Sequence, residues 1–132
     1  MGINRVTACV QVKGDYRKCY EFYTEKVGLV PIYGDGDGPY TNFASCKDGE
    51  PFFAMYCSND LAQRTPGYIV SENGTSTDTL AAVFHTNDFE ADYKRMQEAG
   101  VEFQKADMEC EFNMAVFSDP EGNMLSLEDG GV

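Results

Sequence analysis

The side chains in this sequence that could bind a metal ion or transfer a proton are few and widely spaced. The 132 residues include one histidine, His85, and five cysteines, none of which form a Cys-x-x-Cys pair. A catalytic zinc, iron, nickel or manganese site needs several nitrogen or carboxylate ligands converging at about 2.0–2.3 Å. His85 and Glu128 offer two such ligands near the ends of predicted strands, and Gln11 could add an amide oxygen. No cysteine neighbours His85 in the sequence, so nothing indicates a Cys–His nucleophile.

Composition limits the kinds of partner and compartment. With 10 basic and 22 acidic residues, the formal net charge is −12. Such a charge repels nucleic acids and anionic membranes and would attract a cationic ligand, although an acidic surface also serves solubility alone. No apolar run approaches the roughly 18 residues of a membrane span, and Met1–Arg5 lacks a signal-peptide pattern. The odd number of cysteines argues against a disulfide framework and predicts a reducing, cytoplasmic location.

The elements that position these side chains follow from hydrophobic periodicity. Arg5–Val12 alternates between apolar and polar residues, which predicts a half-buried strand. Asp15 is a good N-cap for an amphipathic helix that continues to about Lys26, and Gly28 suits its C-cap. Three short strands are then expected over residues 29–33, 40–46 and 52–57, the first of them at a sheet edge because it contains a proline.

The second half of the chain repeats this order. Thr79–His85 is a predicted strand, and Asn87 or Asp88 caps a helix that ends near Gly100. Further strands are expected over residues 101–107, 112–117 and 124–128. The repeat predicts an α+β fold of two βαβββ modules, each with a helix on one face of its sheet. The uncovered faces are expected to meet around a shared cavity.

The whole chain, residues 1–132, is expected to form one domain. Module one spans about residues 4–57 and module two about residues 78–129. The connection, residues 58–77, shows no periodicity, and about 20 irregular residues inside a compact domain usually form a linker or a binding loop. Because it contains apolar residues such as Leu61, we expect part of it to pack as a lid or at an interface.

Two motifs resemble those of a known family. Ser118–Glu128 contains an Asp-Pro-Glu-Gly-Asn turn followed by an alternating strand. Glu21–Leu29 contains a Phe-Tyr pair followed by Gly-Leu at the end of the predicted helix. Together with the duplicated βαβββ order, these motifs resemble the vicinal-oxygen-chelate superfamily, which includes glyoxalases, extradiol dioxygenases and bleomycin-resistance proteins. The resemblance covers roughly Arg5 to Asp129 and implies the two-module fold around a cavity.

The resemblance also implies where a metal would bind. Metal-dependent members carry His, Gln or Glu at one position on each of strands one, four, five and eight, and the metal chelates two neighbouring substrate oxygens. In this sequence the four positions fall at Thr7 or Cys9, Ala54, Ala81 and Ser126. None of these is His or Glu, so we expect no metal and no other cofactor. His85 lies four residues beyond Ala81, about 13 Å along a strand.

The function that these features favour is metal-independent binding of a small molecule. The bleomycin-resistance and mitomycin-binding members of the superfamily lack the metal set and bind a cationic or aromatic drug. This chain shares the missing ligands and the negative charge, and 13% of its residues are aromatic. We therefore expect it to sequester an aromatic or cationic ligand. Two alternatives stay open: a glyoxalase-like lyase or dioxygenase relative that uses His85, Glu128 and Gln11, and an interaction module with no small ligand.

The side chains on the uncovered sheet faces are the predicted ligand contacts. They are Thr7, Cys9, Gln11, Ala81, His85, Met114, Met124, Ser126 and Glu128. We also expect a homodimer, because each half-sheet leaves open edges and an apolar rim, and closed twofold dimers are the commonest homo-oligomers. Whether the modules pair within one chain or between two stays open at this point.

Overall fold

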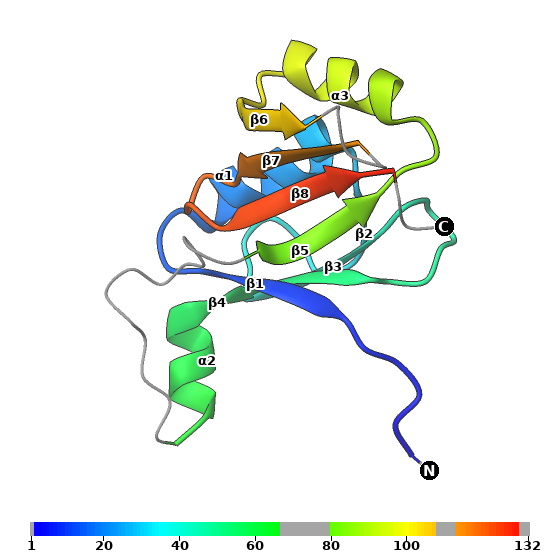
Figure 1. Cartoon of the computed structure of the whole chain (residues 1–132). Helices are drawn as coiled ribbons and strands as arrows, with labels where there is room; N and C mark the ends of the chain where they lie inside the picture. Colours follow the sequence, from blue (N-terminus) through cyan, green and yellow to red (C-terminus); the bar gives the residue numbers. More distant parts are fainter. Residues whose placement is uncertain (1, 67–79, 108–112, 130–132) are drawn as a thin grey trace.

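The computed structural model describes residues 2–66, 80–107 and 113–129. Module one consists of β1 (Ala8–Val12), α1 (Tyr16–Glu21), the π-helical segment η1 (Phe22–Val27), β2 (Val30–Tyr33), β3 (Tyr40–Ala44) and β4 (Phe53–Cys57). Module two consists of β5 (Leu80–His85), α3 (Phe89–Glu98), β6 (Phe103–Asp107), β7 (Met114–Ser118) and β8 (Met124–Glu128). The predicted α+β fold of two βαβββ modules is confirmed (Figure 1).

Each module forms one four-stranded mixed sheet. The strand orders are β1-β4-β3-β2 and β5-β8-β7-β6, so the two sheets have the same topology. The first strand of each module is parallel to the last, and the other pairs are antiparallel. β2 lies at an edge, as Pro31 predicts, because proline cannot donate to a ladder on both sides.

The helices begin and end at the predicted residues. Asp15 Oδ1 accepts a hydrogen bond from Lys18 N at 3.1 Å, and Asp88 Oδ1 accepts one from Ala91 N at 3.2 Å. Asp88, rather than Asn87, is therefore the N-cap of α3. Gly28 closes the first helix with a φ of 93°, a left-handed conformation that favours glycine. The second half of that helix, η1, is π-helical instead of the α-helix that the periodicity predicts.

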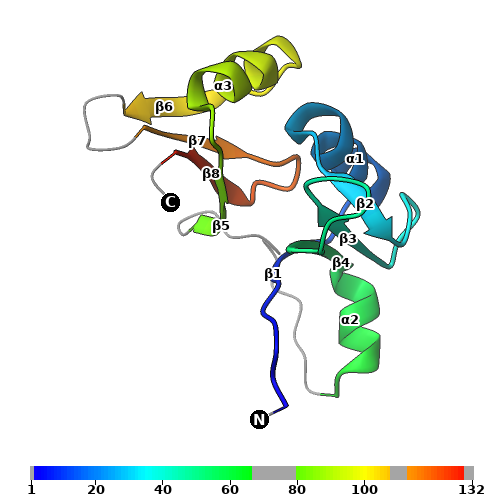
Figure 2. The same ribbon diagram turned by 90° about the vertical axis from the view of Figure 1, so that its right-hand side faces the viewer.

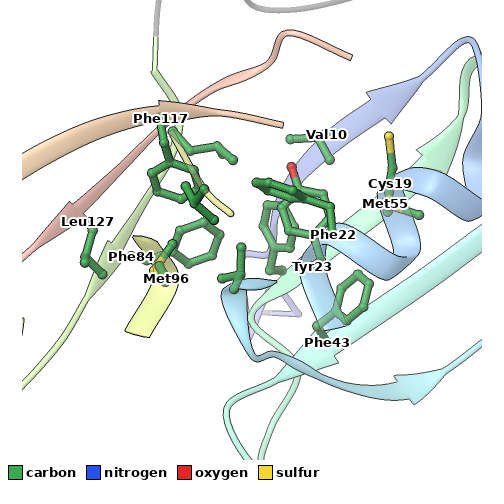
Figure 3. Packing of buried hydrophobic residues seen from close by; sticks show 14 of the residues in the cluster. Val10, Cys19, Phe22, Tyr23, Phe43, Met55, Phe84, Met96, Phe117 and Leu127 are labelled. Carbon is green, nitrogen blue, oxygen red and sulfur yellow. The ribbon is translucent and has the colours of Figure 1, made fainter. Parts of the chain in front are cut away.

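The hydrophobic core lies between the helices and one face of each sheet. Alternate residues of the central strands point into it, among them Val10, Phe53, Phe84 and Leu127. The two modules share this core: the ring of Phe53 lies 5.2 Å from that of Phe84, centroid to centroid. Figure 3 shows the aromatic side chains of both modules side by side. The other face of each sheet is left uncovered by α1, η1 and α3, and in module one α2 (Ser58–Arg64) lies beside it, next to Tyr56.

A set of hydrogen bonds, which we call the module clasp, joins the two modules within one chain. Tyr23 Oη donates to Asp119 Oδ2 at 2.6 Å in the buried core. Glu121 Oε1 accepts from Lys13 N at 2.7 Å and from Gly14 N at 3.1 Å, at the turn between β1 and α1. Asn123 Nδ2 donates to Gln11 O at 3.2 Å. The Asp-Pro-Glu-Gly-Asn turn of module two thus holds module one directly.

Two further features differ from the expected secondary structure. The connection contains a helix, α2 (Ser58–Arg64), where no regular element was expected. β1 begins at Ala8 rather than Arg5, because β4 offers no partner before Phe53. Figures 1 and 2 show residues 2–7 leading away from the sheets, and α2 lying below the end of β4, far from α3. No helix in the described ranges is both long and apolar enough to cross a membrane.

Candidate functional site

The sheet face opposite the helices, here called the open face, carries most of the predicted ligand contacts. Side chains alternate along a strand, so the residues between the core positions point to this face. In module one Cys9 pairs with Ala54 and Gln11 with Tyr56. In module two the corresponding pairs are Val83 with Ser126 and His85 with Glu128. Ala54 and Ser126 are buried in the floor of the face, whereas Cys9, Val83 and His85 are exposed.

The register of β5 corrects one sequence-based assignment. A β-bulge lies between Leu80 and Ala82, so Ala81 has no partner in β8. Ala81 packs against the core cluster, and Val83 pairs with Ser126, whereas the resemblance put the strand-five metal position at Ala81. The bulge also brings Leu80 into register with Met124.

The four positions where metal-dependent relatives would bind their ion do not fit a metal. The sequence places them at Thr7 or Cys9, Ala54, Ala81 and Ser126; the pairing of Cys9 with Ala54 matches that of Val83 with Ser126, so we take Val83 as the β5 position. Two of the four side chains carry no donor atom, and a serine hydroxyl is a weak ligand for a divalent ion. Among residues 2–66, 80–107 and 113–129, no group of three or more His, Cys, Asp or Glu side chains could hold a metal.

The structure separates the residues of the alternative catalytic site. His85 and Glu128 are partners in the β5–β8 ladder, and Ser126 Oγ donates to Glu128 Oε2 at 2.8 Å. Gln11 belongs to the other module, where Ser58 Oγ donates to its Oε1 at 3.3 Å. Figure 1 shows β1 and β5 running in opposite directions, so Gln11 and His85 lie toward opposite ends of the open face.

The other predicted ligand contacts lie at the edges of the open face or carry no reactive group. Thr7, just before β1, is half-buried, as are Met114 and Met124 in β7 and β8. Cys19 is a buried free thiol that could be considered as a nucleophile. Burial raises its pKa to about 12, so the thiol stays protonated at neutral pH. None of these residues forms a catalytic arrangement with His85.

A cavity beside the open face involves none of the predicted ligand contacts. This tyrosine pocket has a volume of about 490 Å³, within the usual range for small-molecule sites. Its walls are Tyr33, Gly34, Asp35, Gly38, Pro39, Tyr40, Tyr56, Asp60, Leu61 and Arg64. The ring centroids of Tyr40 and Tyr56 are 4.7 Å apart, and those of Tyr33 and Tyr40 are 6.0 Å apart.

Sheet register explains why the three tyrosines gather. Tyr40 pairs with Tyr56, and Tyr56 pairs with Gln11, so these side chains form a row across β3, β4 and β1 on the open face. Tyr33 joins the row from β2, where it pairs with Asn42. Burial is the main cause that raises the pKa of Tyr56, so its hydroxyl stays protonated at neutral pH.

Two signals in the sequence could have found the pocket. Tyr40 and Tyr56 lie on the two strands of a predicted hairpin, at positions that point away from the core. Side chains on the same face of paired strands lie next to each other. Asp60, Leu61 and Arg64 recur at three- and four-residue steps, the spacing of one helix face. Leu61, the apolar residue that the sequence singled out in this connection, lines the pocket.

Comparisons with known proteins agree with this architecture. A crystal structure from Sphaerobacter thermophilus DSM 20745, described as a member of the Glyoxalase/bleomycin resistance protein/dioxygenase superfamily, has a TM-score of 0.69 at 22% identity and covers 98% of this chain and 99% of its own. TnmS3, an antibiotic binding protein from Streptomyces sp. CB03234, has a TM-score of 0.65 at 23% identity and covers 98% of each chain. The fosfomycin resistance protein FosX from Listeria monocytogenes has a TM-score of 0.67 at 15% identity, covering 100% of this chain and 97% of its own.

At these identities the solved structures establish the fold alone. No curated protein matches the sequence. The family model Glyoxalase/Bleomycin resistance protein/Dioxygenase superfamily, in contrast, matches residues 2–127, nearly the whole chain. The chain therefore belongs to the glyoxalase/bleomycin resistance protein/dioxygenase superfamily.

Proposed function

We propose that this protein binds and sequesters a small aromatic or cationic molecule without a metal ion. The observation that carries the proposal is the contrast within the open face: the tyrosine pocket lies at one end, whereas the four metal positions hold Cys9, Ala54, Val83 and Ser126. A structural neighbour described as an antibiotic binding protein supports small-molecule binding on this fold.

The chemistry of the pocket suits such a ligand. Three phenol rings supply apolar area with few rotatable bonds, together with hydroxyl groups that can hydrogen-bond. Asp35 and Asp60 add two carboxylates to one arginine, Arg64, in the same walls. The formal net charge of −12 also raises the local concentration of a cationic ligand. Cys9, Cys19, Cys46 and Cys57 are free thiols, which suits the reducing cytoplasm that we propose as the protein's location.

We further propose that the protein is a homodimer that covers part of the open face. Leu80 and Val83 are 40% and 37% exposed there, which leaves apolar surface that a second copy could bury. Light scattering at micromolar concentration checks this proposal, because a monomer has a mass of 14.6 kDa. A mass near that value would refute the dimer.

The contacts of Gln11, His85 and Glu128 support the metal-dependent enzyme less well than the pocket supports ligand binding. The enzyme needs Gln11 and Glu128 to offer oxygens to an ion beside His85, whereas Gln11 Oε1 accepts from Ser58 Oγ at 3.3 Å and Glu128 Oε2 accepts from Ser126 Oγ at 2.8 Å. His85 to Ala and Glu128 to Ala variants with unchanged metal content would reject the alternative.

Metal analysis combined with a binding screen tests the proposed function. Protein purified without a chelator is expected to contain far less than one equivalent of any divalent ion, and thermal shifts with aromatic cations should be equal with and without EDTA. Tyr56→Leu should abolish the shifts, whereas Tyr20→Leu, which removes a half-buried ring from α1, should retain them. A stoichiometric metal together with chelator-sensitive binding would refute the proposal.

A further inference from the structure

We infer that the tyrosine pocket binds a planar organic cation, an amidinium or guanidinium joined to an aromatic ring, and that Arg64 occupies the place of this cation while the pocket is empty. The inference rests on the proposed function and assigns it both a ligand class and a resident competitor. Three observations carry it: the placement of charges on α2, the geometry of the Asp60–Arg64 pair, and the arrangement of the tyrosines.

The charges on α2 line the same cavity. Asp60, Leu61 and Arg64 all form walls of the pocket, and their spacing places them on one face of the helix. Arg64 Nε lies 2.7 Å from Asp60 Oδ2, so the guanidinium of the protein already sits against the carboxylate that a ligand cation would use. Asp35, from the loop after β2, supplies a second carboxylate to the pocket lining.

The pair is built so that it can open. The side chain of Arg64 is 69% exposed and that of Asp60 is 29% exposed, so the arginine lies at the rim and the carboxylate lies deeper. An exposed ion pair contributes little to stability. Arg64 can therefore turn into solvent without leaving a buried charge behind, whereas Asp60 remains in the wall.

A ligand can satisfy Asp60 better than Arg64 does. Arg64 donates to this carboxylate through Nε alone, to one oxygen. An amidinium or guanidinium that enters from the cavity can donate two parallel hydrogen bonds, one to each oxygen, and such bidentate pairs are stronger. The difference in geometry gives the ligand an advantage over the resident side chain.

The tyrosines supply the other half of the recognition. The planes of Tyr40 and Tyr56 are tilted by 59°, and those of Tyr33 and Tyr40 by 51°, so the rings do not stack flat on one another. Tyr33 is 67% exposed, so its ring is accessible to a planar ligand, and the electron-rich faces of phenol rings attract a cation. An aromatic cation engages both features at once.

The anchoring of α2 allows Arg64 to move while the helix stays in place. Ser58, at the first turn, is buried and donates to Gln11 Oε1 at 3.3 Å. Toward the other end, Gln63 and Arg64 are exposed. The helix is thus held to module one at its beginning, and Arg64 lies in its exposed last turn.

The test uses a fluorescent planar dication, 4′,6-diamidino-2-phenylindole, and the neutral 2-phenylindole. Titrations compare the wild type with Asp60→Asn, Arg64→Met and the control Arg17→Met, which removes another exposed arginine that is paired with an aspartate, Asp37, at 2.8 Å. Arg64→Met should bind the dication about threefold tighter, because a weak competitor is lost, and Arg17→Met should not. Asp60→Asn should weaken dication binding about tenfold, because a charged hydrogen bond is lost. Affinity for 2-phenylindole should change in neither Asp60→Asn nor Arg64→Met.

Weaker binding of the dication by Arg64→Met would overturn the competitor role, since it would show that the arginine helps to hold the ligand. Equal affinity of the wild type for both probes, or binding of neither, would overturn the cation site. The proposed function would still stand after either result if other aromatic molecules bound in a Tyr56-dependent, chelator-insensitive way, and it would fail only if the metal analysis or that screen failed.

Discussion

Replacing Tyr23 by phenylalanine probes the module clasp and gives a signal that depends on pH. Tyr23 is fully buried, and its hydroxyl donates to Asp119 Oδ2 at 2.6 Å. The substitution keeps the ring and removes only this donor. Hydrogen bonds to charged groups contribute about 1.5–3 kcal/mol, so we expect Tyr23→Phe to lower the free energy of unfolding by about 2 kcal/mol at pH 7.

The pH dependence follows from the environment of Asp119. Burial raises its pKa above the usual value, and the hydrogen bonds from Tyr23 and Asn123 partly oppose that rise. Without the Tyr23 donor the folded-state pKa rises further above the unfolded value. A carboxyl group with a raised pKa favours the folded state most below the unfolded pKa, and this contribution is lost as pH rises through the folded pKa. The deficit of Tyr23→Phe should therefore shrink as pH falls from 7 toward 4.

Urea denaturation followed by circular dichroism, at several pH values between 4 and 7, measures this deficit. Tyr16→Phe is the matched control, because the Tyr16 hydroxyl lies 2.7 Å from Thr41 Oγ1 and 3.1 Å from Met55 O, and neither partner is a carboxylate. Its deficit should not change over this pH range. A Tyr23→Phe deficit below about 0.5 kcal/mol at pH 7, or one equal at all pH values, would refute the account of the clasp.

Three further substitutions test other parts of the fold. Gly34→Ala should destabilise the protein by about 2 kcal/mol or more in urea denaturation, because Gly34 has a φ of 84° and a Cβ there would lie 2.1 Å from Tyr40 O; an unchanged midpoint would contradict this backbone conformation. Arg95→Met should cost about 1 kcal/mol in the same assay, because Arg95 donates to Lys26 O and Val27 O at the end of η1; a neutral result would show that solvent replaces these bonds. Glu121→Gln should lower the thermal midpoint by a few degrees, because its carboxylate accepts from Lys13 N and Gly14 N; Glu98→Gln, an exposed residue at the end of α3, is the control.

Hydrophobic alternation predicts those strands whose pairing partners are close in the chain. Met124–Glu128 was expected with the bounds that the structure gives, since a proline–glycine turn and a strict alternation coincide there. Alternation does not predict the bulge in β5. The alanines at positions 81 and 82 suit either face of a sheet, and only their pairing with β8 determines which face each one takes. Hydrophobic periodicity does not predict α2 either, because its seven residues carry no apolar stripe.

The candidate site was harder to predict than the fold for a similar reason. Alternation along β1 and β8 assigns every second residue to the open face. Cys9, Ser126 and Glu128 do lie there. The tyrosine pocket depends on register across β2, β3 and β4 and on a helix that the sequence did not reveal. The sequence contains the spacing of these residues, but only the pairing of the strands and the position of α2 bring them together in one cavity.

The two motifs that resemble the superfamily turn out to contact each other. Tyr23, from the Phe-Tyr segment, donates to Asp119, from the Asp-Pro-Glu-Gly-Asn turn, across 96 positions of sequence. Asp119 also accepts from Glu121 N and Asn123 N, which shapes the turn that reaches module one. These residues hold the modules together on the helix side, whereas the open face is built by other residues. The chemistry of the open face can therefore change while the two motifs stay the same. For this reason the motifs identify the fold, whereas the class of ligand depends on the residues of the tyrosine pocket.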